Sequence, residues 1–123
     1  MPTKRSFTKL NIPLKTNATQ IRHDYYVNIM PSSVVNFDIM VNADTQTQGT
    51  ALWKVFGIAK RSASPESAKL VAINDPVVVA TEIFRWTYLE IETDNVRGAL
   101  KISVVGIPEA SITWHLSVQL KEI

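Results

Sequence analysis

The chain has 123 residues, of which 46% are hydrophobic and 20% are charged, and its formal net charge is +2. This balance predicts one globular domain that is large enough to fold without a metal ion or a disulfide. Because there is no cysteine, a disulfide framework, a zinc-thiolate site and a cysteine nucleophile are excluded. No apolar stretch is as long as a signal-peptide core or a membrane span, so we expect synthesis in the cytoplasm and no membrane partner.

Residues 1–20 are predicted to form an extended N-terminal arm, and residues 21–123 the folded domain. The arm combines basic and apolar side chains. Pro2 and Pro13 are expected to interrupt strand pairing there, because proline has no backbone N–H to donate.

Charge is distributed unevenly along the chain. The first acidic residue, Asp24, follows five basic residues: Lys4, Arg5, Lys9, Lys15 and Arg22. Acidic residues then gather later in the chain: Glu82, Glu90, Glu92 and Asp94. One interpretation is two solvated faces. The other is a basic arm that contacts an acidic surface on a neighbouring subunit.

Short strands separated by polar turns are predicted from residue 23 onward. Apolar and polar side chains alternate over residues 23–30 and 35–41, which is typical of strands with one buried face. Residues 50–60 carry apolar side chains on both faces, for example Trp53 on one and Phe56 on the other. That strand is therefore expected to be central in its sheet or to contact a partner. Shorter strands are predicted at residues 69–73 and 77–80.

The next segment predicts a strand, a turn and a return strand. Phe84, Trp86 and Tyr88 share one strand face, and the apolar positions change parity at Leu89, which predicts a β-bulge near Tyr88. Gly98 can adopt the positive φ that a bulged hairpin requires, and the return strand is predicted at residues 99–105.

The final strand has the most regular alternation in the chain. Five apolar side chains point to one face: Ile112, Trp114, Leu116, Val118 and Leu120. A one-residue shift would bury the polar residues between them, so the register is well specified. No segment has a helical period over three turns. The sequence therefore predicts an all-β fold, an antiparallel β-sandwich of Ig-like or jelly-roll form with an extended N-terminal arm.

The sequence contains no motif for catalysis or for cofactor binding. It lacks a phosphate-binding glycine loop, a zinc-protease motif, a nucleophile elbow and an EF-hand loop. His23 and His115 fall on separate strands and are expected to be exposed or half-buried. Glu90 and Glu92 share a strand face, which favours a solvated polar surface over a catalytic pair, while calcium bound there with Asp94 stays open. We predict a non-enzymatic protein with no cofactor and no metal site.

Nucleic-acid binding is not predicted either. Such sites interleave basic and aromatic side chains on one surface, and Lys54 beside Trp53 and Arg85 beside Trp86 come nearest to this pattern. The tryptophans, with Trp114, are instead expected to anchor the core of the sandwich.

A family resemblance lies in the C-terminal third. Residues 98–106 read Gly-Ala-Leu-Lys-Ile-Ser-Val-Val-Gly, and residues 112–118 read Ile-Thr-Trp-His-Leu-Ser-Val. This resembles the NGAL-x-I-x-V-x-G and TI-x-W-x-A-x-V strands of a module common in tailed-bacteriophage structural proteins. The resemblance extends from about residue 51 onward and carries no catalytic residues. The chain has Arg97 and Leu116 where the pattern favours Asn and Ala, and neither change disturbs a strand.

The resemblance implies a component of the bacteriophage virion, made in the host cytoplasm. Two placements are open: a capsid decoration (cement) protein that binds the major capsid protein, and a tail-fibre or spike module that contacts the host surface. The chain has no coiled-coil stalk or fibre-shaft repeat, which favours decoration. The resemblance also implies a homo-oligomer, most simply a homotrimer.

The N-terminal arm is the predicted partner-binding segment. An extended segment can cover a large surface when it orders, and it can add a strand to an exposed sheet edge. The predicted contact residues are Lys4, Arg5, Phe7, Lys9, Ile12, Leu14 and Lys15.

A third hypothesis is a carbohydrate-binding module, since one fold can carry several functions. It predicts an exposed aromatic cluster formed by Tyr25, Tyr26 and Tyr88. An enzyme is the class that the sequence supports least.

Overall fold

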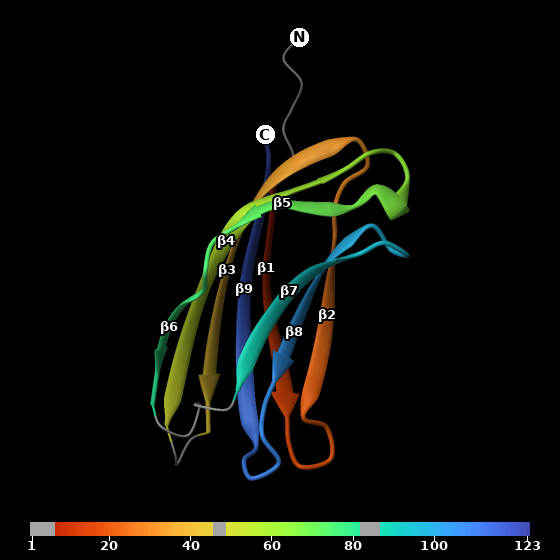
Figure 1. Cartoon of the computed structure of the whole chain (residues 1–123). Helices are drawn as coiled ribbons and strands as arrows, with labels where there is room; N and C mark the ends of the chain where they lie inside the picture. Colours follow the sequence, from red (N-terminus) through yellow and green to blue (C-terminus); the bar gives the residue numbers. More distant parts are fainter. Residues whose placement is uncertain (1–6, 46–48, 82–86) are drawn as a thin grey trace.

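The computed structural model describes residues 7–45, 49–81 and 87–123, which form an antiparallel β-sandwich (Figure 1). These residues make nine strands and one short 3₁₀ helix, Pro65–Ser67. The prediction of an all-β sandwich is confirmed. Its physical basis is the abundance of alternating β-branched and aromatic residues, which pack well on a pleated surface.

The larger sheet has six strands, and the smaller has three. In the larger sheet the order is β1-β9-β3-β4-β5, and β6 also pairs with β4. The strands of this sheet are β1 (Phe7–Thr16), β3 (Ser33–Asp44), β4 (Thr50–Arg61), β5 (Lys69–Ile73), β6 (Val77–Ala80) and β9 (Ile112–Glu122). In the smaller sheet the order is β2-β8-β7, with bounds Arg22–Asn28 for β2, Tyr88–Asp94 for β7 and Ala99–Val105 for β8.

The core lies between the two sheets and contains the tryptophans expected there. Trp114 of β9 is fully buried, Trp53 of β4 is almost so, and their ring centroids are 5.3 Å apart. The indole Nε1 of Trp114 donates a hydrogen bond of 2.9 Å to the buried Oγ1 of Thr16. This bond satisfies a polar group in the core and fixes the end of β1. Trp86 lies outside the described residues.

Two strand predictions are confirmed in detail. All five apolar residues of the final strand are buried, and the residues between them face outward. The strand at residues 50–60 is central, because β4 pairs with β3 on one side and with β5 and β6 on the other. Its second apolar face is the outer face of the sheet, so Phe56 is 50% exposed.

The expectation that Pro13 interrupts strand pairing is wrong. Residues 7–16 of the expected arm form the edge strand β1, which pairs with β9 along its whole length and places Pro13 opposite His115. At an edge, alternate backbone N–H groups point away from the neighbouring strand, so a proline there removes no ladder hydrogen bond. Pro2 lies outside the described residues.

The turn between β7 and β8 of the smaller sheet contacts the larger sheet through Arg61 at one end of the sandwich. Gly98 has a φ of +67°, as predicted, and its N–H donates to Asp94 O at 2.9 Å. Arg61 reaches across from the end of β4, and its Nη1 donates to Ile29 O at 2.8 Å and to Gly98 O at 3.4 Å. A Cβ at position 98 would lie 2.7 Å from the Arg61 guanidinium, so glycine also makes room for this cross-sheet contact.

The parity change expected near Tyr88 falls partly outside the described residues, which omit 84 and 86. From Tyr88 to Asp94 the register with β8 is regular. A register shift does occur in β4, between Ile58 and Ala59, where that strand meets β5. This irregularity lies beside the hollow described next.

Candidate binding surface

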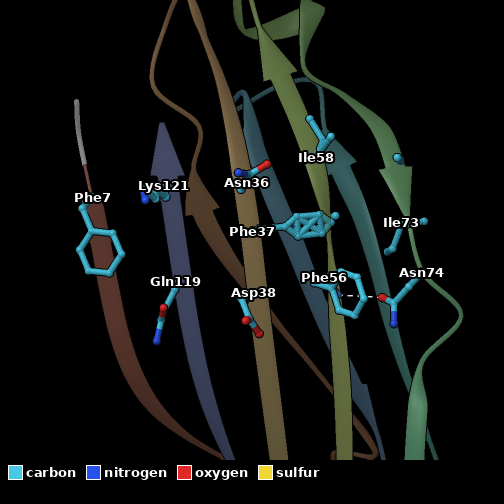
Figure 2. Close-up of a pocket in the computed structure, with 12 residues that line it drawn as sticks. Phe7, Asn36, Phe37, Asp38, Phe56, Ile58, Ile73, Asn74, Gln119 and Lys121 are labelled. Carbon is cyan, nitrogen blue, oxygen red and sulfur yellow. Dashed lines mark hydrogen bonds between the residues drawn. The ribbon is translucent and has the colours of Figure 1, made fainter. Parts of the chain in front are cut away.

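A hollow of about 630 Å³ crosses the outer face of the larger sheet (Figure 2). Ligand pockets in proteins have volumes of this order. Five strands or their ends contribute to its lining: Phe7, Asn36, Phe37, Asp38, Phe56, Gly57, Ile58, Ala72, Ile73, Asn74, Gln119 and Lys121. We call this feature the outer hollow.

Apolar side chains bound the outer hollow at both ends. Phe7 on β1 is 59% exposed, and Phe56 on β4 is 50% exposed with Ile73 nearby. Asn74 fixes the backbone beneath Phe56, because its Oδ1 accepts from Phe56 N at 2.7 Å and its own N–H donates to Phe56 O at 3.1 Å. Both the backbone N–H and the backbone carbonyl of Phe56 are therefore fixed by Asn74.

Polar side chains form the middle of the outer hollow. Asn36 and Asp38 point outward from β3, and Gln119 stands opposite Asp38 on β9. Among the described residues, no hydrogen bond or ion pair engages any of these three side chains. Their donors and acceptors are available to a ligand or to water.

Gly57, in the lining of the outer hollow, has no space for a side chain. A Cβ at this position would lie 2.2 Å from Ala72 O and 2.6 Å from Cζ of Phe37. The missing side chain lets the Phe37 ring lie against the β4 backbone, where it contributes to the lining. Such close contacts with backbone leave little room for adjustment.

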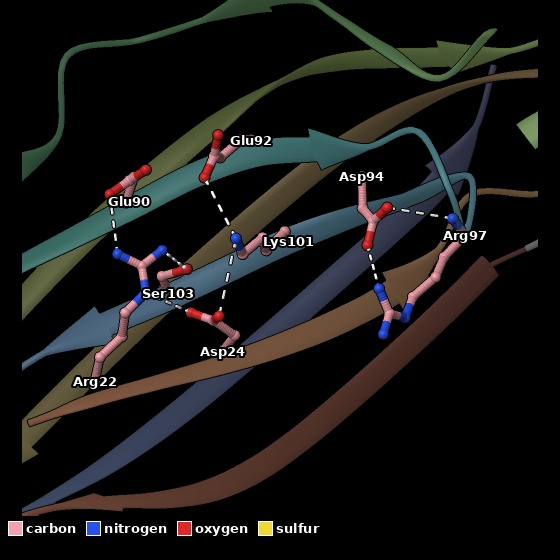
Figure 3. Close-up of polar contacts among 8 residues, drawn as sticks. All are labelled: Arg22, Asp24, Glu90, Glu92, Asp94, Arg97, Lys101 and Ser103. Atoms are coloured by element: carbon pink, nitrogen blue, oxygen red, sulfur yellow. Dashed lines mark hydrogen bonds and ion pairs between the residues drawn. The ribbon is translucent and has the colours of Figure 1, made fainter. Parts of the chain in front are cut away.

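The outer face of the smaller sheet is different, because its charged side chains contact one another (Figure 3). Arg22 is the centre of this group. Its Nε lies 2.9 Å from Asp24 Oδ1, its Nη1 lies 3.7 Å from Glu90 Oε2, and its Nη2 donates to Ser103 Oγ at 3.1 Å. The hydrogen bond that Arg22 donates to Asp24 raises the pKa of Arg22, as does the surrounding negative charge, although burial opposes this.

Lys101 extends the same group toward β7. Its Nζ lies 3.8 Å from both Asp24 Oδ2 and Glu92 Oε1. Burial by itself would raise the pKa of Asp24, but hydrogen bonds with Ser103 and Arg22, together with the charges of Arg22 and Lys101, lower it overall. The six residues of this group are named the ion network: Arg22, Asp24, Glu90, Glu92, Lys101 and Ser103.

Two of the acidic residues noted in the sequence belong to the ion network. Glu90 and Glu92 point to the solvent side of β7, as predicted, and each contacts a basic residue of the same chain. Asp94 accepts from Val96 N–H and pairs with Arg97, and both contacts lower its pKa, the first more strongly. Among the described residues there is no group of three or more side chains able to hold a metal ion.

The predicted partner-binding residues are divided between two faces of β1. Phe7, Lys9 and Lys15 are exposed on the outer face. Leu14 is buried and Ile12 packs against the core, so these two contribute to the interior of their own domain. Lys4 and Arg5 lie outside the described residues.

An apolar edge that the sequence analysis did not single out lies at β6. All four residues of this strand are exposed, and Val77, Val78 and Val79 are 57%, 49% and 65% exposed. Neighbouring residues on a strand point to opposite faces, so exposure of all three means that the described residues cover neither face of β6. We call Val77–Val79 the valine edge. The sequence shows this edge as three consecutive valines, but a run of valines is equally typical of a strand that is buried on both faces.

The three tyrosines do not form a single exposed cluster. Tyr25 packs against the core, whereas Tyr26 faces outward beneath Arg97, whose Cζ lies 4.0 Å from the ring centroid. Tyr88 is 48% exposed and pairs with Val105, several rows of the sheet away from Tyr26.

The two histidines are far from any arrangement that suits catalysis. His23 on β2 is half-buried, with Nδ1 3.5 Å from Lys15 O, and His115 on β9 is exposed on the other sheet. In the described part of the chain, no helix is long and apolar enough to cross a membrane.

No protein-family model matches the sequence, and no curated protein is significantly similar to it. The resemblance of the C-terminal strands to bacteriophage modules is therefore carried by the pattern of residues alone.

Proposed function

We propose that this chain is a non-enzymatic structural protein of a bacteriophage virion, a capsid decoration protein that binds the major capsid shell and stabilises it. The C-terminal strand pattern supports the virion assignment. The valine edge is the observation that supports a role in assembly.

An uncovered apolar edge strand is a liability for a protein that works alone. Such an edge offers unpaired backbone groups and apolar side chains to other chains, and monomeric proteins usually protect it with charges, prolines or bulges. The valine edge has none of these within Val77–Val79. We assign it to the contact with the shell or with other copies of this chain in a homotrimer.

The opposite edge of the larger sheet would contribute charge. Within β1 the charged residues are Lys9 and Lys15, both exposed, and no acidic residue accompanies them. Basic residues at the rim of an interface mainly accelerate association with an acidic surface and make it dependent on salt.

The test is sedimentation of the protein with capsids assembled without it. Val79→Lys places a charge in the valine edge and is expected to weaken binding at least tenfold. Val96→Lys is the matched control, because Val96 is 84% exposed in the turn after β7 and lies outside the edge. Binding of Val79→Lys at the strength of the unchanged protein would contradict the assignment.

A tail-fibre or spike module that contacts the host surface is the second candidate. The observation that favours it is the outer hollow, since a decoration protein needs no ligand site on its exposed face. Localisation by electron microscopy of virions separates the two: many copies on the shell support decoration, and a few copies at the tail support the fibre.

A further inference from the structure

We propose that the outer hollow is a carbohydrate-binding site, in which Phe56 stacks on a sugar ring and Asn36, Asp38 and Gln119 bind its hydroxyl groups. This proposal concerns a different surface from the valine edge, so a failed capsid-binding test would leave it standing.

The outer hollow combines an exposed aromatic ring with amide and carboxylate groups that make no hydrogen bond within the described residues. This combination indicates the class of ligand. A sugar ring has a face of C–H groups, which packs on an aromatic ring, and a rim of hydroxyl groups, each of which donates and accepts hydrogen bonds. Phe56 is half exposed at one end of the outer hollow (Figure 2). The amides of Asn36 and Gln119 each offer a donor and an acceptor, and the Asp38 carboxylate offers two acceptors.

The spacing of these groups suits a short oligosaccharide. Gln119, Asp38 and Phe56 stand opposite one another on the adjacent strands β9, β3 and β4. Neighbouring strands are about 4.8 Å apart, so this row spans about 10 Å, which is the scale of a disaccharide. Phe7 on β1 bounds the same surface one strand further along.

A peptide fits this surface less well than a sugar. The strands that carry the row, β9, β3 and β4, are paired on both sides, so their backbone groups are not available to add another strand. Recognition must then use side chains. The charged residues of the lining are Asp38 and Lys121, one of each sign, which favours a neutral ligand over a polyanion.

The backbone beneath the site is organised before any ligand arrives. Asn74 holds the backbone of Phe56 through two hydrogen bonds, and the close contacts around Gly57 hold Phe37 in the lining. A rigid site loses little conformational entropy on binding, which helps a surface that offers few contacts.

The experiment is a glycan array of bacterial surface oligosaccharides probed with the whole chain, followed by calorimetry with the strongest binder. Phe56→Ala and Asp38→Ala are each expected to weaken binding at least tenfold. Tyr88→Ala is the matched control, because Tyr88 is 48% exposed on the outer face of the other sheet and Phe56 is 50% exposed. Circular dichroism of each variant establishes that it is folded.

Loss of binding in both hollow variants, with Tyr88→Ala unchanged, supports the proposal. Absence of binding to every oligosaccharide on the array overturns it, and so does binding that Phe56→Ala leaves intact. If Phe56→Ala instead weakens binding to capsids and no oligosaccharide binds, the outer hollow belongs to a protein interface and the carbohydrate assignment is wrong.

Discussion

The two outer faces of the sandwich use their polar side chains differently. On the smaller sheet, Arg22 and Lys101 contact acidic residues of the same chain, so that each charge has a partner (Figure 3). On the larger sheet, Asn36, Asp38 and Gln119 make no side-chain hydrogen bond or ion pair in the described part of the protein. One face is satisfied internally, and the other offers its hydrogen-bonding groups to something outside.

The difference shows that polarity alone does not identify a binding surface. Both faces alternate polar and apolar residues along their strands, and both carry charged side chains. A partner that binds there would have to break contacts that already exist, whereas a ligand at the outer hollow displaces only water. The face whose hydrogen-bonding groups are uncommitted is therefore the better candidate for recognition.

The largest expected effect comes from filling the space at Gly57. Gly57→Ala should lower the free energy of unfolding by about 2 to 3 kcal/mol, because the new methyl group overlaps the Ala72 carbonyl and the Phe37 ring. Urea denaturation measures this change. Thr113→Ala, on the exposed face of β9, is the control and should stay within about 0.5 kcal/mol of the unchanged protein. Equal stability of the two variants would mean that the floor of the outer hollow is not rigid.

A smaller effect distinguishes two aspartates on the two faces. Asp24→Ala should cost about 1 kcal/mol of stability, a value already reduced for solvent screening because Asp24 and Arg22 are 29% and 39% exposed. Asp38→Ala should change stability by less than about 0.5 kcal/mol, since Asp38 makes no hydrogen bond or ion pair with the residues that the structure describes. Urea denaturation of the two variants measures both losses of stability. Equal losses would mean that the two faces do not differ in this respect.

The smallest expected effect is a loss of stability at acid pH, which arises from the ion network. The pKa of Asp24 is lower in the folded chain than its ordinary value of 3.8, so its contribution to stability is fully present above pH 3.8. That contribution is lost as the pH falls below 3.8 and through the folded-state pKa. Asp24→Asn should therefore make the stability curve flatter in this range. Thermal melts of this variant and of the unchanged protein from pH 2.5 to 6 measure the difference, and a curve that Asp24→Asn does not flatten would count against the network.

Periodicity in the sequence predicted most of the strands, because burial of one face imposes alternation that is visible without coordinates. The regular pattern of residues 112–120 and the positive φ of Gly98 are both confirmed. Pro13 was interpreted wrongly, since its effect depends on whether the strand lies at an edge, and edge position is a property of the whole sheet.

The candidate site was less predictable than the fold. Phe56 was recognised as part of a second apolar face, but its neighbours in the outer hollow come from four other segments that only the strand order brings together. The valines of β6 were recognised as a strand, but nothing local in Val77–Val79 indicates that both faces would be uncovered.

The position of β9 between β1 and β3 has a consequence for how the chain folds during synthesis. β1 leaves the ribosome before the other described strands, yet its partner in the sheet, β9, is made after all of them, with Phe7 opposite Lys121. The remaining strands can associate earlier, but β1 has no place to dock until residues 112–122 emerge. Contacts between such distant segments form slowly. We expect β1 to stay unpaired in the nascent chain until β9 has been made, and a ribosome-bound chain that stops at residue 110 to leave it exposed to protease.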